Sequence, residues 1–122
     1  MKFIPLIKVK NIARAVDFYT CVLDFELKYP ADEINIFSVS LKKGDCECLL
    51  TETDGMFGIS VMVLVDDVDL LYRKYLKRGL VLPKKENSPV HEKPIDQSWG
   101  LREFYVTDED GNTLRFATAI IK

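Results

Sequence analysis

The residues of this chain that could take part in catalysis or metal binding are three cysteines, one histidine and the residues of an acidic turn. Cys46 and Cys48 alternate along one segment, which places both thiols on the same face of a strand. Two thiols alone do not complete a tetrahedral zinc site, so we interpret them as small buried side chains. Cys21 lies within a helical pattern and is expected to pack there. His91 stands in a Pro-rich connection and is expected at the surface.

The acidic turn is the run Asp108-Glu109-Asp110-Gly111-Asn112 between two strand-like segments. It resembles the first residues of a calcium loop but lacks the later Glu of that motif, so we interpret it as a solvated hairpin turn. Gly111 falls where a positive φ is needed, and Asp108 or Asp110 is expected to accept hydrogen bonds from nearby backbone amides. No group of side chains in these segments combines a nucleophile with a base, and we assign no catalytic residue.

An internal repeat sets the order of the elements that would position these residues. The same spacing separates Ile7 from Val63 and Asn11 from Asp67, and in each half an apolar strand ends at the Asn or Asp before an amphipathic helix begins. Further strands are expected after each helix, at Phe25–Tyr29, Ile34–Leu41 and Cys46–Thr51 in the first half and at Leu80–Lys84, Leu101–Thr107 and Thr113–Thr118 in the second.

The predicted fold class is therefore α+β, with two βαβββ modules at about residues 1–53 and 57–122. The modules are expected to form a single domain, because neither half is long enough to be stable alone. An unrepeated α+β fold is the alternative.

The segment Trp99-Gly100-Leu101-Arg102-Glu103-Phe104, with the turn and Thr113-Leu114-Arg115-Phe116 after it, resembles the closing hairpin of a known superfamily. This is the glyoxalase/bleomycin-resistance/dioxygenase superfamily, also called vicinal oxygen chelate proteins. The Trp-Gly-x-Arg-Glu-Phe opening is most similar to the bleomycin-resistance branch. The resemblance covers essentially the whole chain, including Phe18-Tyr19 followed by Leu23-Asp24-Phe25. It implies two βαβββ repeats that form a curled mixed sheet with an open cleft.

Metal-dependent members of the superfamily bind their ion through His, Gln or Glu at four strand positions. The motifs place these positions at Ile4, Cys48, Ser60 and Arg115. Ile4 has no donor atom, Ser60 is a poor ligand and Arg115 is a fixed cation, so we expect neither a metal nor another cofactor. The alternative is a metal-dependent lyase, isomerase or dioxygenase whose ligands come instead from Glu47, Glu52, Glu103 and His91.

Alternation along the strands sorts side chains between the core and the cleft. The side chains expected to contact a ligand are Ile36, Ser38, Ser60, Met62, Leu64, Trp99, Glu103, Tyr105 and Arg115. Cys46, Cys48 and Leu50 are assigned to the same face as the serines. Trp99 offers a flat surface for stacking a planar ligand, while its alternative role is to pack the strand end or a dimer contact.

Composition and charge argue against nucleic-acid-binding, membrane and secreted disulfide-rich proteins. The net charge of −2 and the mixed signs provide no basic patch for nucleic acid. No apolar stretch is long enough to cross a bilayer, the N-terminus lacks a signal-peptide pattern, and three cysteines do not suggest a disulfide framework. A cytoplasmic location without membrane partners is expected.

The resemblance implies a non-enzymatic homodimer that sequesters a planar or amphipathic, antibiotic-like small molecule in a cleft between subunits. Lys8 and Arg115 are expected to point inward, which makes bleomycin itself a poor candidate ligand. A purely structural or regulatory dimer module, with a cleft filled by its own side chains, is a third possibility.

Overall fold

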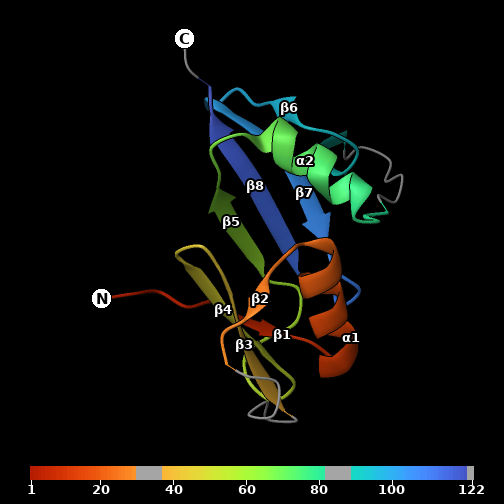
Figure 1. The fold of residues 1–122 in the computed structure, drawn as a ribbon. Helices are drawn as coiled ribbons and strands as arrows, with labels where there is room; N and C mark the ends of the chain where they lie inside the picture. Colours follow the sequence, from red (N-terminus) through yellow and green to blue (C-terminus); the bar gives the residue numbers. More distant parts are fainter. Residues whose placement is uncertain (30–36, 82–88, 121–122) are drawn as a thin grey trace. The chain divides into compact units, whose positions relative to one another are not determined.

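The chain repeats one arrangement of strands and helices twice (Figure 1). The computed structural model describes residues 1–29, 37–81 and 89–120. The first half contains β1 (Leu6–Lys8), α1 (Ile12–Asp17), the wider helical turn η1 (Phe18–Val22), β2 (Glu26–Leu27), β3 (Ser38–Lys43) and β4 (Cys46–Thr51). The second contains β5 (Ser60–Leu64), α2 (Val68–Lys77), the short helix η3 (Pro89–His91), β6 (Ile95–Asp96), β7 (Leu101–Thr107) and β8 (Thr113–Ala119).

Each half forms its own mixed sheet, with strand orders β1-β4-β3-β2 and β5-β8-β7-β6. In both sheets the first strand of the half pairs in parallel with its last strand, and the other pairs are antiparallel. The predicted α+β class with two βαβββ repeats is confirmed. No helix among the described residues has the length and apolar character needed to span a bilayer.

The chain divides into two compact units whose boundaries differ from those of the halves. The first unit consists of Met1–Ile59 and Asp108–Asn112, and the second of Ser60–Thr107 and Thr113–Lys122. The turn between β7 and β8 thus belongs to the first unit, although both strands belong to the second.

Both helices begin at the predicted capping residues. The side chain of Asn11 accepts a hydrogen bond from the amide of Arg14, and Asp67 does the same for Leu70, each at 3.0 Å. The end of α2 differs from the prediction of a strand at Leu80–Lys84. The amide of Leu80 bonds back to the carbonyl of Tyr75 at 3.0 Å, so this residue closes the helix.

The strand beside β7 is β6, where Ile95 pairs with Glu103 and Asp96 with Arg102. Leu80 and Val81 are in no strand, and the rest of the predicted segment lies outside the described residues. Two first-half strands also differ from their predicted bounds. β2 has only two residues and lies at the edge of its sheet, where it pairs with β3 alone. β3 begins at Ser38 after a turn at Phe37, and residues 34–36 are outside the described ranges.

The pairing of β3 with β4 corrects the predicted faces of β4. Cys48 pairs with Leu41 and Leu50 pairs with Val39, and all four are buried. Directly opposed residues of an antiparallel pair lie on the same face, so Cys48 and Leu50 belong to the core of the first unit and do not share the face of Ser38. The prediction was wrong by one residue of register.

Two of the cysteine assignments were also wrong. Cys21 and Cys46 are exposed, and only Cys48 is buried. Cys46 begins β4 directly after the turn at Gly44, where the strand end is open to solvent, and burial raises the pKa of the Cys48 thiol to about 12.

In the second unit α2 packs on one face of the sheet (Figure 1). Phe104 of β7 and Phe116 of β8 stack with ring centroids 5.2 Å apart, and Tyr75 of α2 meets Phe116 edge-on at 5.5 Å. Strand residues next to these phenylalanines point to the face away from α2, which carries no α-helix of this unit and which we call the helix-free face.

Asn112 connects three segments of the first unit. Its Oδ1 accepts hydrogen bonds from the amides of Gly58 and Ile59, both at 3.1 Å, and its Nδ2 donates to the carbonyl of Lys8 at 2.8 Å. Asp108 Oδ1 accepts from the amides of residues 110 and 112, as predicted for this turn, and Gly111 has a φ of 85°. The prediction of a solvated turn was wrong for Asn112, which is buried.

Replacing Asn112 is expected to destabilise the first unit strongly. Asn112→Ala removes the acceptor for two backbone amides and should lower the free energy of unfolding by about 2–4 kcal/mol. Urea denaturation provides the measurement. Glu109→Ala is the control in the same turn: its ion pair with Arg14 is exposed, so its loss should cost less than about 0.5 kcal/mol. Equal effects of the two substitutions would show that the turn is not anchored by Asn112.

Candidate functional site

The helix-free face of the second sheet is ordered in rows by the strand register. Across the four strands, one row contains Ile95, Glu103, Ala117 and Leu64, the next contains Tyr105, Arg115 and Met62, and a third contains Thr107, Thr113 and Ser60. Glu103 and Arg115 are the two charged side chains of these rows. The rest of the face is apolar or carries hydroxyl groups.

Glu103 lies at the centre of this face with none of its surface exposed. Its Oε1 accepts a hydrogen bond from Arg115 at 3.0 Å, and its Oε2 accepts from the indole Nε1 of Trp99 at 2.5 Å. A buried carboxylate without partners would be strongly unfavourable, and here both oxygens are satisfied. One carboxylate therefore fixes both the guanidinium and the indole.

Trp99 lies in the connection between β6 and β7. The amide of Gln97 donates to the carbonyl of Leu101 at 2.8 Å, and Gly100 takes a φ of 90° that favours glycine. These contacts turn the chain so that the indole reaches Glu103 while 57% of the tryptophan stays exposed. The aromatic surface is thus held in place and accessible.

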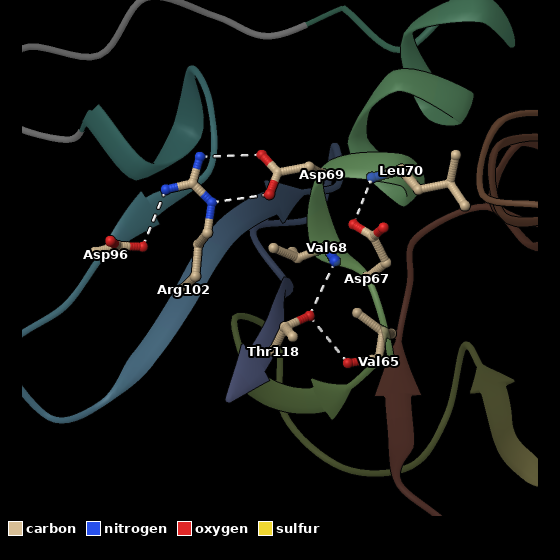
Figure 2. A network of polar contacts seen from close by, with 8 residues as sticks. All are labelled: Val65, Asp67, Val68, Asp69, Leu70, Asp96, Arg102 and Thr118. Carbon is tan, nitrogen blue, oxygen red and sulfur yellow. Dashed lines mark hydrogen bonds and ion pairs between the residues drawn. The ribbon is translucent and has the colours of Figure 1, made fainter. Parts of the chain in front are cut away.

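Arg102 anchors the same segment from the opposite face of the sheet (Figure 2). Its guanidinium donates two hydrogen bonds to Asp69 of α2, at 2.9 and 3.0 Å, and one to Asp96 of β6 at 3.0 Å. The hydrogen bonds from Arg102 hold the pKa of Asp69 below its usual value. Arg102 therefore connects α2 to both strands that flank Trp99.

Tyr105, His91 and Thr107 extend the network of polar and aromatic contacts. The Arg115 guanidinium lies over the Tyr105 ring at 4.9 Å, and the His91 ring meets the same tyrosine edge-on at 5.6 Å. His91 Nε2 is 2.9 Å from the hydroxyl of Thr107, which is 2.8 Å from that of Thr113. His91 is buried, so the prediction of a surface position was wrong.

The electrostatics of the pair keep both groups charged. Burial alone would raise the pKa of Glu103, but hydrogen bonds from Trp99, Arg115 and Tyr105 outweigh it and lower the pKa below the usual value. The hydrogen bond to Glu103 raises the pKa of Arg115. Burial, and then the neighbouring Glu103, raise the pKa of Tyr105, so its phenol stays protonated at neutral pH.

The structure thus brings together most of the residues that the sequence indicated. Seven of them belong to the second unit, namely Ser60, Met62, Leu64, Trp99, Glu103, Tyr105 and Arg115. Ser38 lies in the first unit, opposite Thr51, and Ile36 is outside the described residues. His91 was not included, because its contact with Thr107 joins residues that no sequence motif relates.

The register also corrects one of the four positions at which metal-dependent relatives bind their ion. Met62 pairs with Arg115 in the second half, and Leu6, the equivalent of Met62, pairs with Leu49 in the first. The position equivalent to Arg115 is therefore Leu49, and the assignment to Cys48 was wrong by one residue.

The side chains at the corrected positions, Ile4, Leu49, Ser60 and Arg115, do not fit a divalent metal. Two are hydrocarbons, one is an alcohol and one is a cation. Among the described residues, no three His, Cys, Asp or Glu side chains are grouped so that they could hold a metal ion.

Comparison of the sequence with models of protein families assigns the chain to a superfamily. The family model described as Glyoxalase/Bleomycin resistance protein/Dioxygenase superfamily matches residues 5–116, and the chain belongs to this superfamily. No curated protein sequence matches the chain.

Solved structures share the fold at low sequence identity. One is a bleomycin-binding protein complexed with bleomycin, 18% identical, covering 97% of this chain and 98% of the other, with a TM-score of 0.75. A bleomycin resistance determinant encoded on the transposon Tn5 is 18% identical over 99% of both chains, with a TM-score of 0.76. TnmS3, an antibiotic binding protein from Streptomyces sp. CB03234, is 20% identical over 98% of this chain and 97% of the other, with a TM-score of 0.70.

The lowered pKa of Glu103 predicts a specific loss of stability in acid. In the folded state the carboxyl stays ionised to a lower pH than in the unfolded state, so its stabilising contribution is present above about pH 4.3 and is lost as the pH falls through the folded pKa. Glu103→Gln should flatten this part of the dependence of unfolding free energy on pH. Urea denaturation between about pH 3 and 7 measures it, with Glu92→Gln, an exposed carboxyl of the same unit, as control. If the unfolding free energies of wild type and Glu103→Gln depend on pH in the same way, the pKa of Glu103 is not lowered in the folded state.

Proposed function

We propose that this protein binds and sequesters a small planar or amphipathic molecule without transforming it, as antibiotic-binding members of its superfamily do. The observation that carries the proposal is the arrangement around Glu103. An exposed indole is held beside a guanidinium by one buried carboxylate, and exposed Met62 and Leu64 lie on the same sheet face. A flat apolar surface next to a few fixed polar groups is what a site that binds by shape and stacking requires.

The chemistry of the residues supports binding over catalysis. Glu103 accepts hydrogen bonds from three neighbouring side chains and has a lowered pKa, which makes it a weak general base. Arg115 is permanently charged and cannot transfer a proton at neutral pH. Tyr105 has a raised pKa and stays protonated. These groups orient a ligand; they do not provide a nucleophile with an activating base.

The names of structural neighbours support the same class of function. Two of them are described by their binding of bleomycin or an antibiotic, and a third is a bleomycin resistance determinant. By analogy with this branch we propose a cytoplasmic homodimer, with the helix-free face of each copy contributing to a cleft between subunits. The exposed apolar side chains Met62, Leu64 and Trp99 provide area for such a cleft.

Trp99 provides the test of the proposal. Trp99→Ala should weaken binding of a planar ligand by about 1–3 kcal/mol, and Trp99→Phe should retain most of the affinity because it keeps an aromatic surface. Ligands are found with wild-type protein by quenching of its sole tryptophan, using bleomycin and a panel of fused-ring aromatic compounds. Affinities of the variants are then compared by calorimetry, since neither contains tryptophan.

Size-exclusion chromatography with light scattering and circular dichroism of both variants provide the controls. If Trp99→Ala unfolds or changes the oligomeric state while Trp99→Phe binds like wild type, the indole has a structural role. Equal affinities of the alanine variant and wild type would contradict stacking on Trp99.

The residue types at the corrected metal positions predict weak metal retention. After incubation with Ni²⁺, Zn²⁺, Mn²⁺ or Fe²⁺ and desalting, the purified untagged protein should retain far less than one equivalent by quantitative metal analysis. Arg115→Glu should behave similarly, because Ile4 and Leu49 have no donor atom and Ser60 is a poor ligand. Near-stoichiometric metal in the wild type would instead favour a metal-dependent lyase, isomerase or dioxygenase.

A further inference from the structure

The charged group that this site presents to a ligand is a cation. Glu103 has none of its surface exposed, while the Arg115 side chain, paired with it at 3.0 Å, is 30% exposed. The carboxylate is thus sealed beneath its partners, and the Arg115 side chain is the member of the pair that meets solvent. Among the described residues of the three rows, Glu103 is the only acid, so no other carboxylate in these rows balances the charge of Arg115.

Arg115 also has unused hydrogen-bonding capacity. A guanidinium has five N–H donors, and Glu103 takes one of them, through a nitrogen at the end of the side chain. The buried Nε of Arg115 has no hydrogen-bond partner among the described residues, but it is not open to solvent. Tyr105 covers one side of the guanidinium plane by a cation–π contact and also shares a hydrogen bond with Arg115. The side chain is therefore held in position, and donors at its terminal nitrogens remain available.

The free donors lie beside the stacking surface. Arg115 and Trp99 donate hydrogen bonds to the two oxygens of the same Glu103 carboxylate. The guanidinium and the indole therefore lie close to each other on either side of that carboxylate. A ring stacked on Trp99 would bring a substituent on its edge to Arg115. Met62, next to Arg115 in the same row and half exposed, would contact the apolar part of such a ligand.

We propose that the ligand is a planar aromatic molecule that carries a carboxylate, bound with its ring on Trp99 and its carboxylate on Arg115. This inference rests on the proposed function and specifies the ligand class of the same site. Planar guanidinium groups match carboxylates through paired hydrogen bonds, which are stronger than those between neutral groups. A cationic ligand would meet the positive charge of Arg115 and find the only acid of these rows already sealed, so the site selects against it.

Three probes of matched shape test the charge preference: 2-naphthoate, 2-naphthamide and 2-naphthylmethylammonium. They are titrated into the wild-type protein at pH 7, with quenching of Trp99 as the signal and calorimetry as a check. The carboxylate should bind about tenfold tighter than the neutral amide, and the ammonium should bind more weakly than both.

Variants assign the preference to Arg115. In the double variant Glu103→Gln with Arg115→Met, which removes both charges together, the carboxylate and the amide should bind equally. Glu103→Gln alone removes the buried counter-charge and should increase the preference for the carboxylate. Arg73→Met is the matched control, because it removes an exposed arginine on α2, on the other side of the sheet, and should leave all three affinities unchanged.

The outcomes separate this inference from the proposed function. Equal affinities of the three probes, with normal quenching of Trp99, would overturn the charge preference and leave small-molecule binding in place. Tighter binding of the ammonium would overturn it as well, as would a carboxylate preference that persists in the double variant. Failure of all three probes and of the larger aromatic panel to bind would overturn both proposals.

Discussion

Glu103 places a carboxylate in the interior of the second unit, and a buried charge of this kind is tolerated only when it is paired and hydrogen-bonded. Arg115 and Trp99 meet this requirement from two different segments of the chain. The pair also determines what else can happen on the helix-free face: the guanidinium is held over Tyr105, and the indole is held at the surface. A single electrostatic constraint thus organises the stacking surface and its neighbouring donor.

The second constraint is the parallel pairing of the first and last strands in each repeat. This pairing puts Leu49 and Arg115 at equivalent backbone positions, opposite Leu6 and Met62. Metal-dependent members of the superfamily use these positions for ligands, whereas here a hydrocarbon and a cation occupy them. The same backbone scaffold can therefore serve metal chemistry or simple binding, depending on a few side chains that the register brings to one face.

The predictions that succeeded depended on interactions between residues close in sequence. Asn11 and Asp67 cap helices whose first amides lie three residues away, and Gly111 takes the positive φ that its turn requires. The failures involved distant partners. Leu80 ends a helix by bonding to Tyr75 where a strand was predicted, Cys48 faces the core because it pairs with Leu41, and His91 is buried because it contacts Thr107.

The sequence by itself determined the duplicated βαβββ order, the turn chemistry and the residue types that make a metal site unfavourable, because apolar periodicity, capping and donor chemistry are properties of local segments. Only the tertiary structure decided which member of the Glu103–Arg115 pair is exposed and which side of β4 faces the core. Strand register and burial depend on partners far along the chain, and a shift of one residue exchanges the two faces of a strand.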